Sequence, residues 1–128
     1  MKSILLATMG ACLLAAGACQ STTVRGSHGE AFTATTDRSM TIRRGASAPL
    51  EVSIDRQNTT GPVTVSISQL PRGVNADKSS IHVESTAATF ILTASEAAEL
   101  VSNQAVGVTV EDTAGRRSLQ YVNLTVTN

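Results

Sequence analysis

From residue 31 onward, apolar and polar side chains alternate along the chain. A period of two is typical of β-strands that bury one face and expose the other to solvent. The clearest runs start at Leu50, Val63, Thr89 and Val106 and read LEVSID, VTVSI, TFIL and VGVTV. Clusters of Gly, Pro, Ser and Asn separate the runs, as turns do. The pattern predicts an all-β domain over residues 31–128, an antiparallel β-sandwich of seven to eight strands.

The alternation also predicts which side chains face the core. The inward set of the two valine-rich runs is Val63, Val65, Ile67, Val106, Val108 and Val110. Phe32 and Phe90 fall on inward positions, and Phe90 is the largest side chain expected inside its strand. His82 and Tyr121 are expected to face solvent.

Two segments depart from the regular pattern. Residues 118–127 place Leu119 and Tyr121 on one parity and the valines after them on the other, which predicts a β-bulge or a change of sheet. Residues 95–103, SEAAELVSN, read as one helical turn on a connection. Gly115 is expected to take the left-handed position of a three-residue hairpin loop, Thr113–Gly115, before the last strand.

The first 18 residues have the features of an export signal. Lys2 gives a positive start, and residues 4–18 are almost unbroken apolar or small residues. This run is too short to cross a bilayer, which takes about 20 residues. Residues 14–19, LAAGAC, resemble the lipobox of bacterial lipoproteins. We therefore expect a signal peptide over residues 1–18, cut between Ala18 and Cys19.

The lipoprotein resemblance implies a chemical role for Cys19. In that family the cysteine thiol is alkylated by diacylglycerol, and the new amine then takes a fatty acid such as palmitate. Membrane lipid is thus the expected partner of Cys19, whereas Cys12 is expected to be a passive part of the apolar run. Gln20 stands where an aspartate commonly marks inner-membrane retention, which favours the outer membrane in a Gram-negative cell. Plain secretion after the same cut is the alternative.

A polar segment, QSTTVRGSHGE, follows the cysteine at residues 20–30. It contains Gly and Ser and has no apolar period. We expect residues 19–30 to be the lipidated cysteine followed by a flexible tether, with His28 solvated rather than bound to a metal.

Two motifs inside the strand region resemble bacterial immunoglobulin-like repeats of envelope and secreted proteins. TGPVT at 60–64 matches a common strand start, and LPRGV at 70–74 matches a common corner. The resemblance covers residues 31–128 and implies an immunoglobulin-like sandwich. Modules of this kind serve as spacers, stalks and binding units, so the fold does not select one function.

Composition removes several classes of function. Ten basic and ten acidic residues balance, so the chain lacks the positive footprint of a nucleic-acid-binding protein. Both cysteines lie in the first 19 residues, so the rest of the chain cannot form an intrachain disulfide. Arg43–Arg44 and Arg116–Arg117 are either solvated strand ends or contacts for lipid headgroups and anionic polymers. Carbohydrate is not an expected partner, because Tyr121 is the one aromatic side chain expected on the surface.

No motif for catalysis or metal binding occurs. CxxC, HExxH, GxSxG and P-loop patterns are absent. Ser79 or Ser80 could join His82 and Asp77 in a triad only if the fold brought them together. Glu111–Asp112 could contribute to a calcium site, but two carboxylates before a hairpin are more typical of a turn. The sequence predicts no catalytic residue, no cofactor and no metal.

Two functions remain open at this level. The first is a lipid-anchored protein of the cell envelope whose immunoglobulin-like module is not an enzyme and binds or spaces an envelope protein partner. The alternative is a small secreted or lipid-anchored enzyme or inhibitor with its site on loops.

Overall fold

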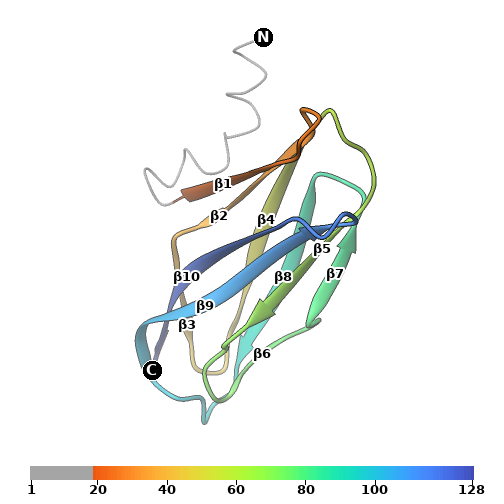
Figure 1. Cartoon of the computed structure of the whole chain (residues 1–128). Coiled ribbons are helices and arrows are strands. Elements are labelled where there is room, and N and C mark those ends of the chain that lie inside the picture. The colour runs from red at the N-terminus through yellow and green to blue at the C-terminus, as the bar shows by residue number, and fades with distance from the viewer. Residues whose placement is uncertain (1–18) are drawn as a thin grey trace, which may run out of the picture.

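The computed structural model describes residues 19–128, which form ten β-strands in two five-stranded sheets (Figure 1). The strands are β1 (Cys19–Arg25), β2 (Ala31–Asp37), β3 (Ser39–Arg43), β4 (Ser47–Gln57), β5 (Val63–Ser68), β6 (Val74–Ala76), β7 (Ser80–Val83), β8 (Ala87–Ala94), β9 (Val101–Asp112) and β10 (Arg117–Thr127). Sheet A has the order β1-β2-β4-β8-β6, and sheet B has the order β3-β10-β9-β5-β7. The expected signal peptide, with Cys12 and Ala18, lies outside the described residues.

One pair of strands breaks the antiparallel rule. All neighbours in both sheets are antiparallel except β3 and β10, which run parallel with Ser39 opposite Asn123. This arrangement arises because β2 belongs to sheet A and β3 to sheet B, so the chain changes sheet at Arg38. The last strand, β10, consequently lies between β3 and β9 (Figure 1).

The core lies between the sheets and has the composition that the alternation predicts. Phe32 and Phe90 are both buried, at 2% and 0% exposure, and are the largest side chains inside. Five of the six predicted inward residues of the valine-rich runs are buried, and Ile67 is half-buried. His82 and Tyr121 face solvent, as expected. The all-β sandwich is therefore confirmed.

The expected tether at the start of residues 19–30 is wrong, because Cys19–Arg25 is strand β1. It pairs with β2 over seven consecutive positions, from Cys19 opposite Asp37 to Arg25 opposite Ala31. Hydroxyl pairs reinforce the ladder on its outer face, with Ser21 Oγ 2.8 Å from Thr35 Oγ1. β1 carries no apolar period because two residues of its inner face, Gln20 and Thr22, are polar and hydrogen-bond to β10, so the sequence pattern suggests coil. With the short strand β6, it raises the count to ten.

The predicted change of parity in the last strand is also wrong. Alternation runs unbroken through β10, and the inward positions before Val122 are taken by Ser118 and Gln120, each 4% exposed. The irregularity lies instead in β9, where the register with β10 shifts between Leu124 and Val126. Asn103 in β9, with a φ of 53°, takes the left-handed conformation at this bulge.

Residues 95–103 form no helical turn. Ser95 to Ala98 is a β-turn closed by the Ala98 amide on the Ser95 carbonyl at 3.1 Å, and β9 already begins at Val101. Ala98 is fully buried and fixes the turn against the sandwich. The hairpin loop with Gly115 at a φ of 86° is confirmed. Within residues 19–128, no helix is long and apolar enough to span a membrane.

Candidate functional site

The predicted anchor residue, Cys19, is the first residue of an edge strand. Its carbonyl oxygen accepts a hydrogen bond of 2.8 Å from Arg38 Nε, and its sulfur lies 3.9 Å from Asp37 Oδ1. Cys19 is thus held by Asp37 and Arg38, where the chain passes from sheet A to sheet B.

The next residue, Gln20, ties the same strand to the other sheet. Its side-chain amide donates to the carbonyl of Asp37 at 3.3 Å and to the carbonyl of Tyr121 in β10. Because the side chain of Gln20 is bound to two strands in this way, the preceding residue, Cys19, has little freedom to move away from the sandwich.

A buried polar cluster lies beneath β1. The amide of Gln120 donates to Thr22 Oγ1 at 2.8 Å and to the Ala34 carbonyl at 3.1 Å, and its oxygen accepts from Thr36 Oγ1 at 3.3 Å. These bonds satisfy the polar groups that the inner face of β1 and Gln120 bring into the sandwich. Ser118 lies two residues before Gln120 in β10, and its buried Oγ has no hydrogen-bond partner among the described residues.

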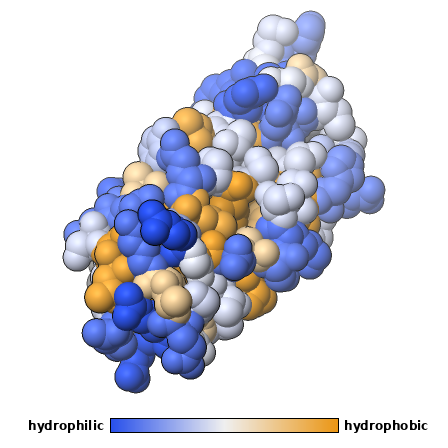
Figure 2. Space-filling model, turned by 90° about the horizontal axis from the view of Figure 1, so that it is seen from below, coloured by the Kyte–Doolittle hydropathy of each residue, from blue (hydrophilic) through white to orange (hydrophobic). Residues whose placement is uncertain are grey.

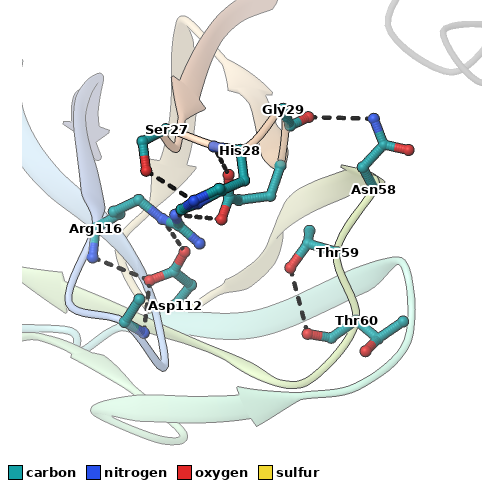
Figure 3. Close-up of polar contacts among 10 residues, drawn as sticks. Ser27, His28, Gly29, Asn58, Thr59, Thr60, Asp112 and Arg116 are labelled. Carbon is teal, nitrogen blue, oxygen red and sulfur yellow. Dashed lines mark hydrogen bonds and ion pairs between the residues drawn. The ribbon is translucent and has the colours of Figure 1, made fainter.

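A second polar site joins loops at one end of the sandwich (Figure 3). Arg116 Nε lies 2.7 Å from Asp112 Oδ2, and Arg116 Nη1 lies 3.3 Å from Glu30 Oε2. Asp112 also accepts the backbone amides of Ala114 and Arg116, each at 2.9 Å, which shapes the hairpin loop. Arg116 therefore links the β9–β10 hairpin to the loop that follows β1.

The charges of this site stabilise one another. The backbone amides of Glu30 itself and of His28 lower the pKa of the Glu30 carboxyl, and Arg116 adds to the effect. Partial burial works to raise the pKa of Asp112, but hydrogen bonds from Arg116 and Ala114 outweigh it and leave the pKa below its ordinary value. The hydrogen bond to Asp112 raises the pKa of Arg116.

The β4–β5 loop is bound to the same end of the sandwich as Arg116. Asn58 Nδ2 donates to the Gly29 carbonyl at 3.2 Å, which joins the β4–β5 loop to the β1–β2 loop (Figure 3). Arg56 donates to the carbonyls of Gly61, Ser85 and Val83 at 3.0, 2.6 and 2.9 Å, which fixes the β4–β5 loop against the β7–β8 turn. We call this set of joined connections, residues 26–30, 58–62 and 113–116, the loop end.

The residues considered for a catalytic triad are engaged elsewhere. Exposed His82 hydrogen-bonds through Nδ1 to Thr64 Oγ1 across the neighbouring strand, at 3.1 Å. Asp77 Oδ1 accepts the Ile91 amide at 2.9 Å, and this bond lowers the pKa of Asp77. The carboxylate of Asp112 organises a hairpin, as turn formers do, and residues 19–128 contain no group of three or more His, Cys, Asp or Glu that could hold a metal ion.

The opposite end of the sandwich is more apolar. Leu100 is 48% exposed there and lines an open hollow of about 320 Å³ with the start of β9, Val101 and Ser102, and with residues 125–128. Figure 2, which looks at the molecule from below, shows hydrophobic residues reaching the surface between hydrophilic ones. No charged side chain lines the hollow.

Sequence reasoning missed the residues that order these sites. Arg56 carries no motif, and its three carbonyl acceptors lie in the β4–β5 loop, in the β7–β8 turn and at the end of β7. Gln20 and Gln120 read as surface residues, since a lone glutamine gives no signal of burial. A glutamine on the inward parity of a strand, as Gln120 is, is the one signal that could have indicated a buried polar cluster.

Comparison with known proteins adds no assignment, because no protein-family model and no curated protein matches this chain.

Proposed function

We propose that this chain is a bacterial lipoprotein of the cell envelope. Its signal peptide, residues 1–18, is cut between Ala18 and Cys19, and the mature protein is an immunoglobulin-like sandwich anchored through acylated Cys19. The observation that carries the proposal is the lipobox-like LAAGAC, which ends on the residue that also opens strand β1. In a Gram-negative cell, Gln20 after the anchor directs the protein to the outer membrane.

The anchor has a definite chemistry. Transfer of diacylglycerol to the thiol of Cys19 forms a thioether. Cleavage also removes Cys12, which leaves Cys19 as the only cysteine. Two or more acyl chains are needed for stable anchoring, at about 0.8 kcal/mol per buried CH₂, and a triacylated cysteine meets that need.

The anchored module is a binding unit rather than an enzyme, and its partner is an envelope protein. The loop end supports this role, because Arg116, Arg56 and Asn58 hold its connections together before any partner arrives. Loops on a rigid scaffold are the usual place for binding residues, and a fixed conformation reduces the entropy lost on association. The loop end also lies at the far end of β1, about 20 Å from Cys19 along the strand.

Cysteine variants test the anchor. Cys19→Ser is expected to abolish labelling by a fatty-acid analogue and to release the protein from the membrane fraction. Cys12→Ser is the matched control and is expected to keep both. Absence of label in the native protein, or equal labelling of Cys19→Ser and wild type, would refute the lipid anchor and leave plain secretion.

Photo-crosslinking in intact cells tests the binding role. A photoreactive residue at Thr60, in the loop end, is expected to give a discrete protein adduct. The same residue at Thr89, exposed on the outer face of β8, is the control and is expected to give none. Equal adducts at both positions, or none at Thr60, would refute binding through the loop end.

A further inference from the structure

The anchor has no spacer, and this fixes where the bilayer must lie. Cys19 is already paired with Asp37, its carbonyl is bound by Arg38, and Gln20 is bound to β10. If the acyl chains begin at Cys19, the leaflet that holds them lies directly against the sandwich. The inference below rests on the acylation of Cys19 that we propose above.

The surface beside Cys19 consists of two edge strands. β1 is an edge of sheet A, β3 is an edge of sheet B, and the chain passes from one sheet to the other between them at Arg38. Figure 1 shows both strands on the same side of the molecule. We call this side, made of β1, Asp37–Arg38 and β3, the anchor flank.

The anchor flank is positive although the rest of the domain is not. Residues 19–128 carry nine basic and ten acidic side chains, since Lys2 is the one charged residue before them. On the anchor flank the balance reverses, because Arg25, Arg38 and Arg43 face a single carboxylate, Asp37.

The three arginines are available to a ligand. All three are exposed, and none takes part in an ion pair within the described chain. Arg38 uses Nε to hold the Cys19 carbonyl. A guanidinium placed in this way can still present its terminal nitrogens to a phosphate, which it binds with two parallel hydrogen bonds.

We propose that the anchor flank lies on the phospholipid leaflet that holds the acyl chains, with Arg25, Arg38 and Arg43 on anionic headgroups. The sandwich then lies edge-on to the membrane instead of moving freely on a tether. An arginine near an anionic leaflet shifts the ratio of docked to undocked protein about fivefold, and three shift it roughly a hundredfold. The opposite edges, β6 and β7, face away from the membrane.

The test measures which edge touches lipid in the acylated full-length protein. A fluorophore is attached to Thr41→Cys on β3 or to Ser80→Cys on β7, which are exposed residues on opposite edges of the same sheet. Each protein is reconstituted into vesicles of phosphatidylcholine and phosphatidylglycerol that contain headgroup-labelled nitroxide lipid. We expect several-fold stronger quenching at position 41 than at position 80. Equal quenching at both positions would overturn the proposal.

A linker variant isolates the arginines. A flexible Gly/Ser insert between Cys19 and Gln20 removes the geometric constraint, so that docking depends on charge alone. Quenching at position 41 is expected to persist in this variant and to disappear when Arg25→Gln, Arg38→Gln and Arg43→Gln are added. Loss of quenching in the linker variant with all arginines present would refute their contact with headgroups.

The mass of the reconstituted protein separates the two proposals. If Cys19 carries no acyl chains, the lipid anchor is wrong. If Cys19 is acylated and the two edges are quenched alike, the anchor stands and the edge-on orientation is wrong.

Discussion

Gly73 occupies a position that no side chain can share. Its φ is 87°, in the left-handed region, and its carbonyl accepts the Ser95 amide at 2.9 Å. A Cβ at Gly73 would lie 2.5 Å from the Cα of Ala98, which is backbone and cannot rotate away. The β5–β6 corner and the β8–β9 turn thus approach each other through this one glycine.

Gly73→Ala should therefore cost two separate energies. The left-handed conformation costs an L-residue about 1–2 kcal/mol, and forcing an extra methyl into a packed site costs about 1–3 kcal/mol. Gly115→Ala is the matched control, because Gly115 has a φ of 86° and nothing within 4 Å of its Cβ position. Gly115→Ala has only the cost of the left-handed conformation. The difference in unfolding free energy between the two variants therefore measures the close approach of Gly73 to Ala98.

Urea denaturation of the unacylated Cys19→Ser protein gives the answer. With a slope of about 2 kcal/mol/M, Gly73→Ala is expected to lower the midpoint by about 1–2.5 M, and Gly115→Ala by at most about 1 M. Equal midpoints for the two variants would refute the close approach and reduce the effect to backbone strain.

Three further predictions concern the core and the loop end. Phe90→Ala is expected to cost about 3–5 kcal/mol in urea denaturation because it empties a fully buried site, whereas exposed Thr89→Ala costs under about 1 kcal/mol. Ser118→Ala is expected to raise the free energy of unfolding by about 1 kcal/mol, since it removes a buried hydroxyl without a partner; a fall would show that the hydroxyl is bonded. The carboxylates beside Arg116 have lowered pKa values when folded, so their contribution is present above about pH 4 and is lost as the pH falls through the folded values. Arg116→Gln should flatten this loss in midpoints measured from neutral to acid pH, and an unchanged acid profile would contradict the assignment.

The sequence predicts the parts of the fold that apolar contacts decide. Val65, Val108 and Phe90 lie on strands whose other face is polar, and burial of one face leaves a period of two that can be read directly. The Gly115 hairpin is also readable, because few residues adopt a positive φ in a three-residue loop.

The parts that polar contacts decide could not be predicted. β1 pairs with β2 and is also tied to β10 by Gln20 and Thr22, whose partners lie 98 or more residues away, and nothing local to these residues records those partners. For the same reason Ser118 and Gln120 suggested a break in β10 where none exists. The loop end also depends on contacts that no local pattern records, from Arg116 to Glu30 and from Arg56 to Val83 and Ser85.

The place of β10 in the sheet has a consequence for how the chain acquires its structure. β10 follows all the other described strands along the chain, yet it lies between β3 and β9, and its Asn123 pairs with Ser39, 84 residues earlier. Pairings of such long range are slow to form and dominate the folding rate. Sheet B cannot close until residue 127 is available, so the sandwich folds only after β10 has been made. A stalled or truncated product exposes two unpaired strands, which is a surface for aggregation and not a slightly smaller domain.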